Sequence, residues 1–412
     1  MNKQQEPRLR FKGFTGEWEE KVLGENASFT KGSGYSKSDL TDSGFPIILY
    51  GRLYTKYENI IENIDTFVSC DKNALKSLGN EVIVPASGET AEDIARASAV
   101  YQQDVILGGD LNIITPNENI ASPFLALTLT NGKSNQELAK KAQGKSVVHL
   151  RNDDLRACKI SFPSFLEQTH LGLFFRRLDS QIAESRAVLE KSRQLKKAML
   201  AKMFPANGEK IPKIRFKGFE GEWESRKLGE IAFKVKEKNI AYQYAETFTN
   251  SAEFGIISQQ DFFDKSISNS ENIGGYYVVQ PDDFVYNPRI SSFAPVGPIK
   301  RNKLERTGVM SPLYYVFRLN DEIKPSYLEQ YFEGNQWHHF MYLNGDTGAR
   351  SDRFSIKNDV FAEMPISFPA NKNEQTQIGN FFRQLDETIA LQSAEVEKLN
   401  QLKKGLLAAM LV

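Results

Sequence analysis

RFKGFTGEWE begins at Arg10 and RFKGFEGEWE begins at Arg215, so one ten-residue phrase occurs twice with a single substitution. Extended in both directions, residues 7–25 match residues 212–230 at thirteen of nineteen positions. Three further phrases recur 206 or 207 residues later: ISFP (160, 366), EQT (167, 374) and QLKK (194, 401). Because the stretches between these frames differ almost completely, the chain is a tandem duplication with a different insert in each half.

The segment 167–204 has the pattern of a long coiled-coil helix. Apolar or small side chains recur at steps of three and four for most of its length, and the pattern returns 207 residues later. A helix of nearly forty residues with one apolar stripe needs a partner. We therefore expect an antiparallel pair with pseudo-twofold symmetry, and two separate surface helices are the alternative. The predicted seam comprises Leu178, Ile182, Leu189, Leu195, Leu385, Ile389, Val396 and Leu402.

In an antiparallel pair, each repeated phrase lies beside a helix end. We therefore interpret each phrase as a joint between that helix end and a globular domain. Its aromatic side chains would pack in the joint, and Gly13 and Gly218 would allow tight bends. Ligand binding by these aromatic residues is the alternative. They are Phe11, Phe14, Trp18, Phe216, Phe219 and Trp223.

The two inserts are predicted to be mixed α/β domains, because each combines short β-rich runs with helix-like stretches such as 122–131 and 326–343. The fold expected is thus two tandem α/β domains joined by two long antiparallel coiled-coil helices. The predicted boundaries are an N-terminal joint (1–21), insert one (22–158), a central frame (159–226), insert two (227–364) and a C-terminal helix (365–412).

Composition sets further limits on the class of protein. The 412 residues carry a formal net charge of zero, so any DNA-binding surface would have to be a local patch. Two cysteines are too few for a disulfide framework, and a reducing cytoplasm is the expected compartment. No apolar run is long enough to predict a membrane span.

Basic side chains among polar and aromatic neighbours suit phosphates and base edges, and a solvated charged face is the alternative. The richest such stretch is residues 287–306 of insert two, with a polar loop at 345–359 and weaker stretches in insert one. The DNA-binding candidates are Arg52, Tyr54, Lys56, Lys145, Arg289, Lys300, Arg301, Lys303, Arg306, Arg350 and Arg353.

Catalytic motifs are incomplete throughout the sequence. GKS at Gly132 and Gly144 lacks the glycine that a P-loop places five residues earlier. FTKGSG at 29–34 only approximates a methyltransferase glycine loop. The PD at 281–282 and the EIK at 322–324 are too far apart in the sequence to indicate a nuclease site of the PD…ExK type. His338 and His339 have no ligand partner at metal-binding spacing. We therefore predict no catalytic residue and no metal site.

The whole pattern resembles the specificity subunits of type I restriction-modification enzymes, through RFKGF…GEW at the start of each half, ISFP…EQT after each insert, and the long QLKK helices. The resemblance implies that each insert reads one half of a bipartite DNA target, while the helices set the spacer and dock two methyltransferase subunits. It also implies that S-adenosylmethionine, ATP and Mg belong to those subunits and to the restriction endonuclease/translocase subunits. This chain would then be a non-catalytic subunit without a cofactor.

Two other functions remain open at this point. One is a coiled-coil scaffold whose domains bind other proteins, and the other is a self-contained DNA methyltransferase or nuclease, for which the motifs are missing.

Overall fold

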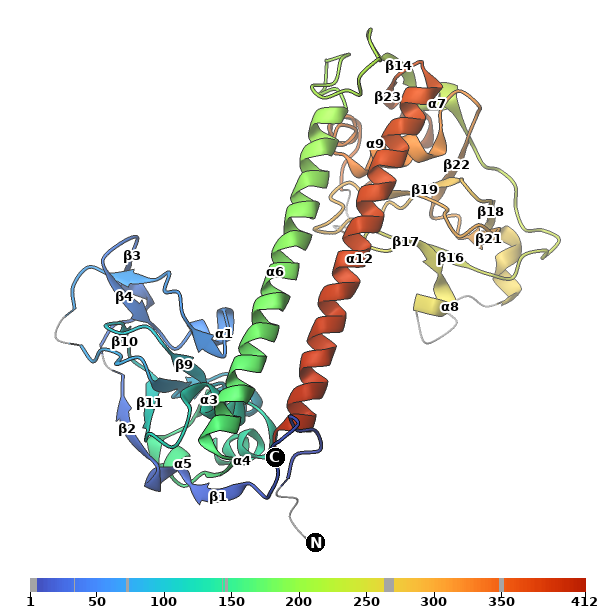
Figure 1. The fold of residues 1–412 in the computed structure, drawn as a ribbon. Coiled ribbons are helices and arrows are strands. Elements are labelled where there is room, and N and C mark those ends of the chain that lie inside the picture. Colours follow the sequence, from blue (N-terminus) through green and yellow to red (C-terminus); the bar gives the residue numbers. More distant parts are fainter. Residues whose placement is uncertain are drawn as a thin grey trace. The chain divides into compact units, whose positions relative to one another are not determined.

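The computed structural model describes residues 6–32, 34–71, 74–142, 144, 147–262, 270–347 and 352–412. Its contacts divide the chain into unit 1, Met1–Val188 with Gln392–Val412, and unit 2, Leu189–Leu391. The longest elements are helices α6 (Phe165–Met203) and α12 (Lys372–Met410), each of 39 residues (Figure 1). The expected helix at 167–204 corresponds to α6.

The two long helices pack against each other within each unit. In unit 1 the first part of α6 meets the last part of α12, where Lys403 lies 2.5 Å from Asp179. In unit 2 the last part of α6 meets the first part of α12, where Phe204, directly after α6, stacks on Phe382 with ring centroids 6.0 Å apart. The helices therefore run antiparallel, which confirms the predicted pairing.

The constant frames form the same two-stranded sheet in both units. In unit 1, β1 (Glu19–Val22) pairs antiparallel with β13 (Lys159–Phe162), and Glu19 lies opposite Phe162. In unit 2, β14 (Glu224–Lys227) pairs with β23 (Pro365–Phe368), and Glu224 lies opposite Phe368. The repeated ISFP phrase thus ends each insert as a strand that pairs with the segment after the repeated RFKGF phrase.

Insert one is built around a five-stranded and a four-stranded sheet. The five-stranded sheet has the order β2 (Ala27–Lys31), β11 (Leu111–Pro116), β7 (Glu81–Pro85), β9 (Ser98–Val100), β5 (Ile60–Ile61). The four-stranded sheet has the order β10 (Ile106–Leu107), β4 (Phe45–Ile48), β6 (Phe67–Val68), β3 (Leu40–Thr41). Strand β8 (Ser87–Gly88) pairs with β12 (Val148–His149). The helices are α1 (Arg52–Thr55), α2 (Ala91–Ile94), α3 (Ser122–Thr130), α4 (Gly132–Lys141) and α5 (Asn152–Arg156).

Insert two has a four-stranded antiparallel sheet with the same order along the chain as β2-β11-β7-β9 of insert one, namely first, last, second and third strand, and it has different strands around this sheet. Its four-stranded sheet has the order β15 (Ala232–Lys234), β22 (Tyr315–Leu319), β19 (Phe284–Tyr286), β20 (Ile299–Arg301). Two pairs accompany it: β16 (Phe248–Ser251) with β17 (Gly255–Ser258), and β18 (Tyr277–Val279) with β21 (Gly308–Met310). The helices are α7 (Leu228–Ile231), α8 (Gln259–Phe262), α9 (Pro325–Glu333), α10 (His338–Asn344) and α11 (Asn358–Ala362). Both inserts are mixed α/β, as expected.

The helix-like stretch 326–343 is interrupted in the structure. Helix α9 ends before Gly334, and α10 begins at His338. The buried indole of Trp337 donates a hydrogen bond to the carbonyl oxygen of Gly334 at 3.0 Å, which fixes the break. Within the described residues, no helix has both the length and the apolar character needed to cross a bilayer.

The predicted seam needs one correction in each helix. Leu178, Ile182 and Leu189 are buried, and Leu385, Ile389 and Val396 are half-buried. Leu195 and Leu402, by contrast, are 45% and 51% exposed. The prediction took two successive steps of three after Leu189 and its equivalent, and six residues turn a helix about 120° away from the seam. Seven residues turn it by only about 20°, so the seam passes through Lys196 and Lys403 instead.

Candidate nucleic-acid interface

An arginine in each repeated phrase clamps the start of a long helix. In unit 1, Arg10 donates from Nε and Nη2 to the two carboxylate oxygens of Glu167, both at 2.7 Å, and from Nη1 to the carbonyl oxygen of Gly16. In unit 2, Arg215 makes the same bonds to Glu374 at 2.7 and 2.8 Å and to the carbonyl oxygen of Gly221. Both carboxylates are buried. Such bidentate pairs are strong and geometrically specific, which explains why the phrase and EQT recur together.

The glutamine of each EQT phrase ties the long helix to the insert beside it. Gln168 Oε1 accepts the backbone N–H of Ala121, which precedes α3, at 3.0 Å. Gln375 Oε1 accepts the backbone N–H of Lys324, which precedes α9, at 2.8 Å. Helices α3 and α9 are therefore equivalent elements, and each follows the strand, β11 or β22, that lies second in its sheet. This equivalence was not predicted, although the similar openings SPFL (122–125) and PSYL (325–328) were a signal for it.

The expected packing in the joints is found for Phe11, Trp18, Phe216 and Trp223. Trp18 is buried edge-to-face against Phe124 of α3, and Trp223 is buried in the same way against Tyr327 of α9. Phe11 packs on α6 and Phe216 on α12 in the same manner. Gly13 and Gly218 have φ values of 100° and 97°, which confirms the predicted bends.

Two ion pairs between the long helices also follow the duplication. Lys403 of α12 reaches Asp179 of α6 at 2.5 Å in unit 1, and Lys196 of α6 reaches Asp386 of α12 at 2.6 Å in unit 2. In unit 2 Lys196 also lies 3.9 Å from Glu333 of α9. Burial opposes the ionisation of Glu333, but Lys300 and Lys196 outweigh it and hold the pKa of Glu333 below its usual value. These charges fix α9 to both helices within unit 2.

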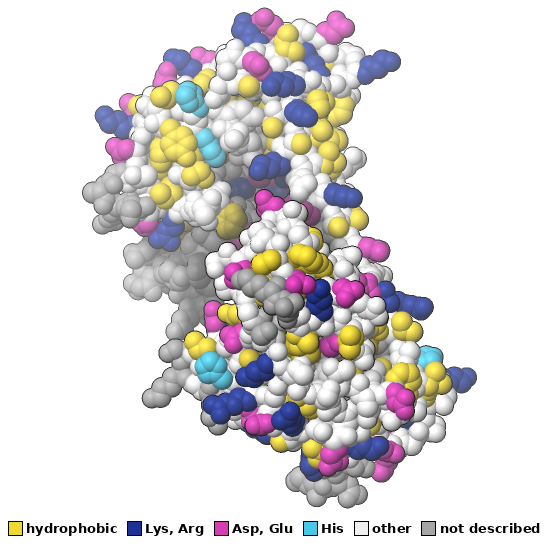
Figure 2. Space-filling model, turned by 90° about the vertical axis from the view of Figure 1, so that its left-hand side faces the viewer, with side chains coloured by type: hydrophobic (Ala, Val, Ile, Leu, Met, Phe, Trp, Pro, Cys, Tyr) yellow, Lys and Arg dark blue, Asp and Glu magenta, His cyan; other side chains and the backbone are white. Residues whose placement is uncertain are grey.

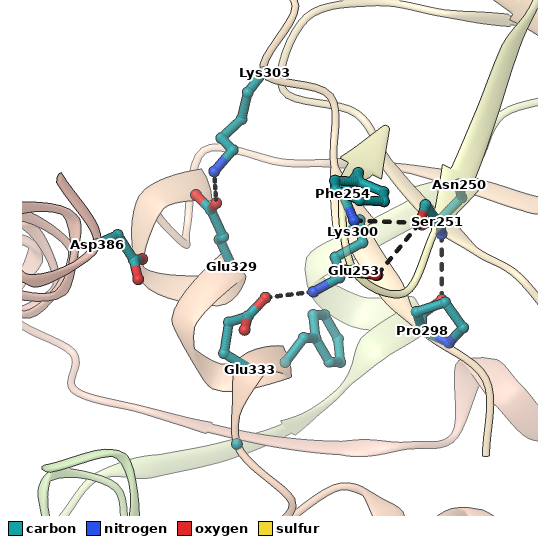
Figure 3. Close-up of polar contacts among 12 residues, drawn as sticks. Asn250, Ser251, Glu253, Phe254, Pro298, Lys300, Lys303, Glu329, Glu333 and Asp386 are labelled. Atoms are coloured by element: carbon teal, nitrogen blue, oxygen red, sulfur yellow. Dashed lines mark hydrogen bonds and ion pairs between the residues drawn. The ribbon is translucent and has the colours of Figure 1, made fainter. Parts of the chain in front are cut away.

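The basic stretch of insert two is largely neutralised by the protein itself. Figure 3 shows Lys300 bonded to Glu333 at 2.6 Å and Lys303 to Glu329 at 2.8 Å, both on α9. Arg301 pairs with Glu329 and Asp282, and Arg306 makes two 2.7 Å bonds to Glu246. Arg301 and Lys300 are mostly covered, so the structure gives them a role in fixing β20 to α9, whereas Lys303 and Arg306 remain accessible.

Arg289 and Arg353 lie opposite each other across an isolated antiparallel bridge. Arg289 is 68% exposed, and its ion pair with the carboxylate of Asp352 is long, at 4.0 Å. Arg289 is thus accessible, as are Lys303 and Arg306, whereas Arg353 is half-buried. Lys145 and Arg350 lie outside the described residues.

In insert one, the structure overturns the expectation for Arg52. Its guanidinium is buried and binds Glu58 at 2.7 Å, the carbonyl oxygen of Asn63 at 2.8 Å, and Asp65. Hydrogen bonds from Lys56 and then Arg52 lower the pKa of Asp65 to about 2. Arg52 therefore closes the loop after α1 rather than facing a ligand, because local acidic residues satisfy it first.

Tyr54 and Lys56 differ from Arg52 in accessibility. The hydroxyl of Tyr54 donates to the carbonyl oxygen of Ser87 at 3.0 Å, and burial raises its pKa to about 12. Lys56 keeps half of its side chain exposed although it pairs with Asp65. Lys56 is thus the one of these two that could reach a phosphate without breaking the fold.

Charges of both signs share one face of the molecule (Figure 2). On the face drawn in Figure 2, Lys and Arg side chains are interspersed with Asp and Glu side chains. Among the residues that the structure describes, no group of three or more His, Cys, Asp or Glu side chains could hold a metal ion.

Comparison with known proteins identifies the family to which this chain belongs. The model of the type I restriction modification DNA specificity domain matches residues 15–191 and 220–401. The crystal structure of the S subunit of a type I restriction-modification system from M. genitalium is similar over 99% of both chains, with a TM-score of 0.61 and 12% identity. A structure from work on complex assembly and conformational transition of the type I R-M system is similar over 95% of this chain and 96% of that chain, with a TM-score of 0.52 and 15% identity. These likenesses support the fold, and the family match spans both halves. The chain therefore belongs to the family of type I restriction-modification DNA specificity domains.

Proposed function

We propose that this chain is the specificity subunit of a type I restriction-modification complex, in which insert one and insert two each read one half of a bipartite double-stranded DNA target. The observation that carries the proposal is the contrast between the frames and the inserts. The Arg10–Glu167 and Arg215–Glu374 clamps are equivalent, and so is the order of four antiparallel strands in each insert. The strands around that core differ, because insert one adds β5 and the sheet β10-β4-β6-β3, whereas insert two adds the pairs β16-β17 and β18-β21. A constant frame that carries a replaceable insert lets each insert change its DNA sequence preference independently of the other.

The long helices would set the distance between the two readers and dock two methyltransferase subunits. Two equivalent joints on one chain offer two equivalent surfaces, which suits two copies of the same partner. Helices α6 and α12 are the natural spacers, because a packed helix pair keeps a fixed length of about 1.5 Å per residue.

The chemistry of the complex would lie in its partners. S-adenosylmethionine belongs to the methyltransferase subunits, and ATP and Mg belong to restriction endonuclease/translocase subunits. The present chain would act by binding and positioning DNA in the cytoplasm, and it would carry out neither methyl transfer nor cleavage itself.

The proposal is tested by reconstituting the chain with its methyltransferase partner. The complex should methylate adenines only at one bipartite sequence, the partner alone should show no such selectivity, and the purified chain alone should transfer no methyl group. A complex without sequence preference, or methyl transfer by the chain alone, would refute the proposal. Assembly with proteins but not with DNA would favour the scaffold function instead.

A further inference from the structure

The loop between β19 and β20 ends in a tight turn that projects one aromatic ring. Ser291 and Ala294 exchange two backbone hydrogen bonds, each of 3.1 Å. Phe293 at the tip is 83% exposed, more than any other large apolar side chain in the described part of the chain. An exposed ring gains free energy when a partner buries it, and a single exposed apolar side chain becomes informative through the turn that holds it and the charges around it.

The base of this turn is held on both sides. The hydroxyl of Tyr286 donates to the carbonyl oxygen of Val296 at 2.9 Å, and the side chain of Asn287 donates to the carbonyl oxygen of Asn250 at 2.9 Å. The backbone of Ile290 is bonded to that of Asp352 at 3.0 Å. The ring is thus presented by a fixed turn, which lowers the entropy lost when it binds.

The turn also has a geometric requirement at its C-terminal side. Gly297 has a φ of 84°, and a Cβ at this position would lie 2.1 Å from the carbonyl oxygen of Asn287. Only glycine lets the chain return this closely to β20. The projection of Phe293 is therefore built into the local sequence.

The charges beside the turn indicate what the ring meets. Residues 287–304 contain no acidic residue. Arg289, four residues before the ring, is 68% exposed; it lies opposite the half-buried Arg353 and 4.0 Å from the carboxylate of Asp352, so two arginines stand against one acid there. An apolar ring flanked by cations complements a polyanion with an apolar interior. Double-stranded DNA has this chemistry, since apolar side chains can enter between stacked base pairs while arginine binds the flanking phosphates.

We propose that Phe293 inserts as a wedge between two adjacent base pairs of the half-site bound by insert two, with Arg289 on a neighbouring phosphate. This assignment rests on the proposed function of the chain. The wedge selects sequence by deformability, so the step that it opens is a flexible pyrimidine–purine step. Insert two thus reads one position without a hydrogen bond to a base edge.

The test uses the complex with methyltransferase and duplexes that carry 2-aminopurine at one position at a time across the methylated half-site. Unstacking raises the fluorescence of this base. The unchanged complex should raise it at one step, Phe293→Ala should abolish the rise and weaken binding about tenfold, and Phe293→Trp should keep both. Arg289→Ala should keep the rise and lower the salt slope by about one.

The matched control is Phe233→Ala, which removes an exposed phenylalanine from β15, at the opposite edge of the four-stranded sheet from β20. It should leave the fluorescence and affinity unchanged. An unaltered rise in Phe293→Ala would overturn the wedge, as would loss of methyltransferase binding without DNA, because the ring would then be a protein contact. If the unchanged complex bound no duplex specifically, the proposed function itself would fail. That result differs from failure of the wedge alone, in which specific binding remains but the fluorescence does not depend on Phe293.

Discussion

Replacing Glu374 with glutamine leaves Arg215 without its anionic partner at the start of α12. The carboxylate is 1% exposed and accepts two bonds from a guanidinium that is only 15% exposed. Removal of one partner from such a buried pair costs about 3–5 kcal/mol, because the other charge stays buried and unpaired. Partial access of water to Arg215 places the expected loss near the lower value, about 3 kcal/mol.

For a unit of this size, about 3 kcal/mol corresponds to a fall in melting temperature of about 6–12 °C. It also raises the local opening equilibrium by about two orders of magnitude. Hydrogen exchange read by mass spectrometry should therefore accelerate in the second RFKGF phrase and in the first turns of α12. Glu167→Gln should have the equivalent effect on the first phrase and the start of α6.

The matched control is Glu363→Gln, which breaks the Lys227–Glu363 pair in the same unit. Both of its side chains are more than half exposed, so the loss should stay below about 1 kcal/mol. If Glu374→Gln and Glu363→Gln were equally stable, the buried clamp would not be what holds the joint.

Three further predictions concern the helices and the cysteines. Leu178→Glu, which places a carboxylate in the buried seam, should cost about 3–5 kcal/mol and reduce co-elution with methyltransferase in size-exclusion runs, whereas Leu402→Glu on the exposed face should be tolerated. Extending both α6 and α12 by four residues at equivalent positions should lengthen the preferred DNA spacer by about one to three base pairs in a methylation assay. An active variant with an unchanged optimum spacer would show that the helices do not set the distance between the half-sites. Because burial raises the pKa of Cys158 to about 11, its thiol stays protonated near neutral pH, so iodoacetamide at about pH 8 should label exposed Cys70 and spare Cys158; equal labelling would contradict this.

The duplication made the frame of this protein predictable. A repeated phrase with repeated aromatic residues and glycines indicates one structure built twice, and Trp18 and Trp223 occupy equivalent buried positions. The partners of Arg10 and Arg215 were not predicted, because Glu167 and Glu374 lie more than 150 residues further along the chain.

The limits of the sequence analysis have physical causes. Arg52 and Arg301 look like ligand-binding residues in a linear stretch, yet Asp65 and Glu329 neutralise them once the chain folds. Leu195 was assigned to the seam because it is apolar, whereas helical geometry places Lys196 there. Phe293 was passed over because only the turn shows that its ring projects.

The independence of the two inserts is tested most directly by exchanging one of them. Residues 227–364 are replaced with the corresponding insert of another specificity subunit, and methylated adenines are mapped across the genome of cells that carry the chimera. We expect one half of the methylated sequence to change to that of the donor, while the other half and the spacer stay the same. A change in both halves, or in neither, would contradict it.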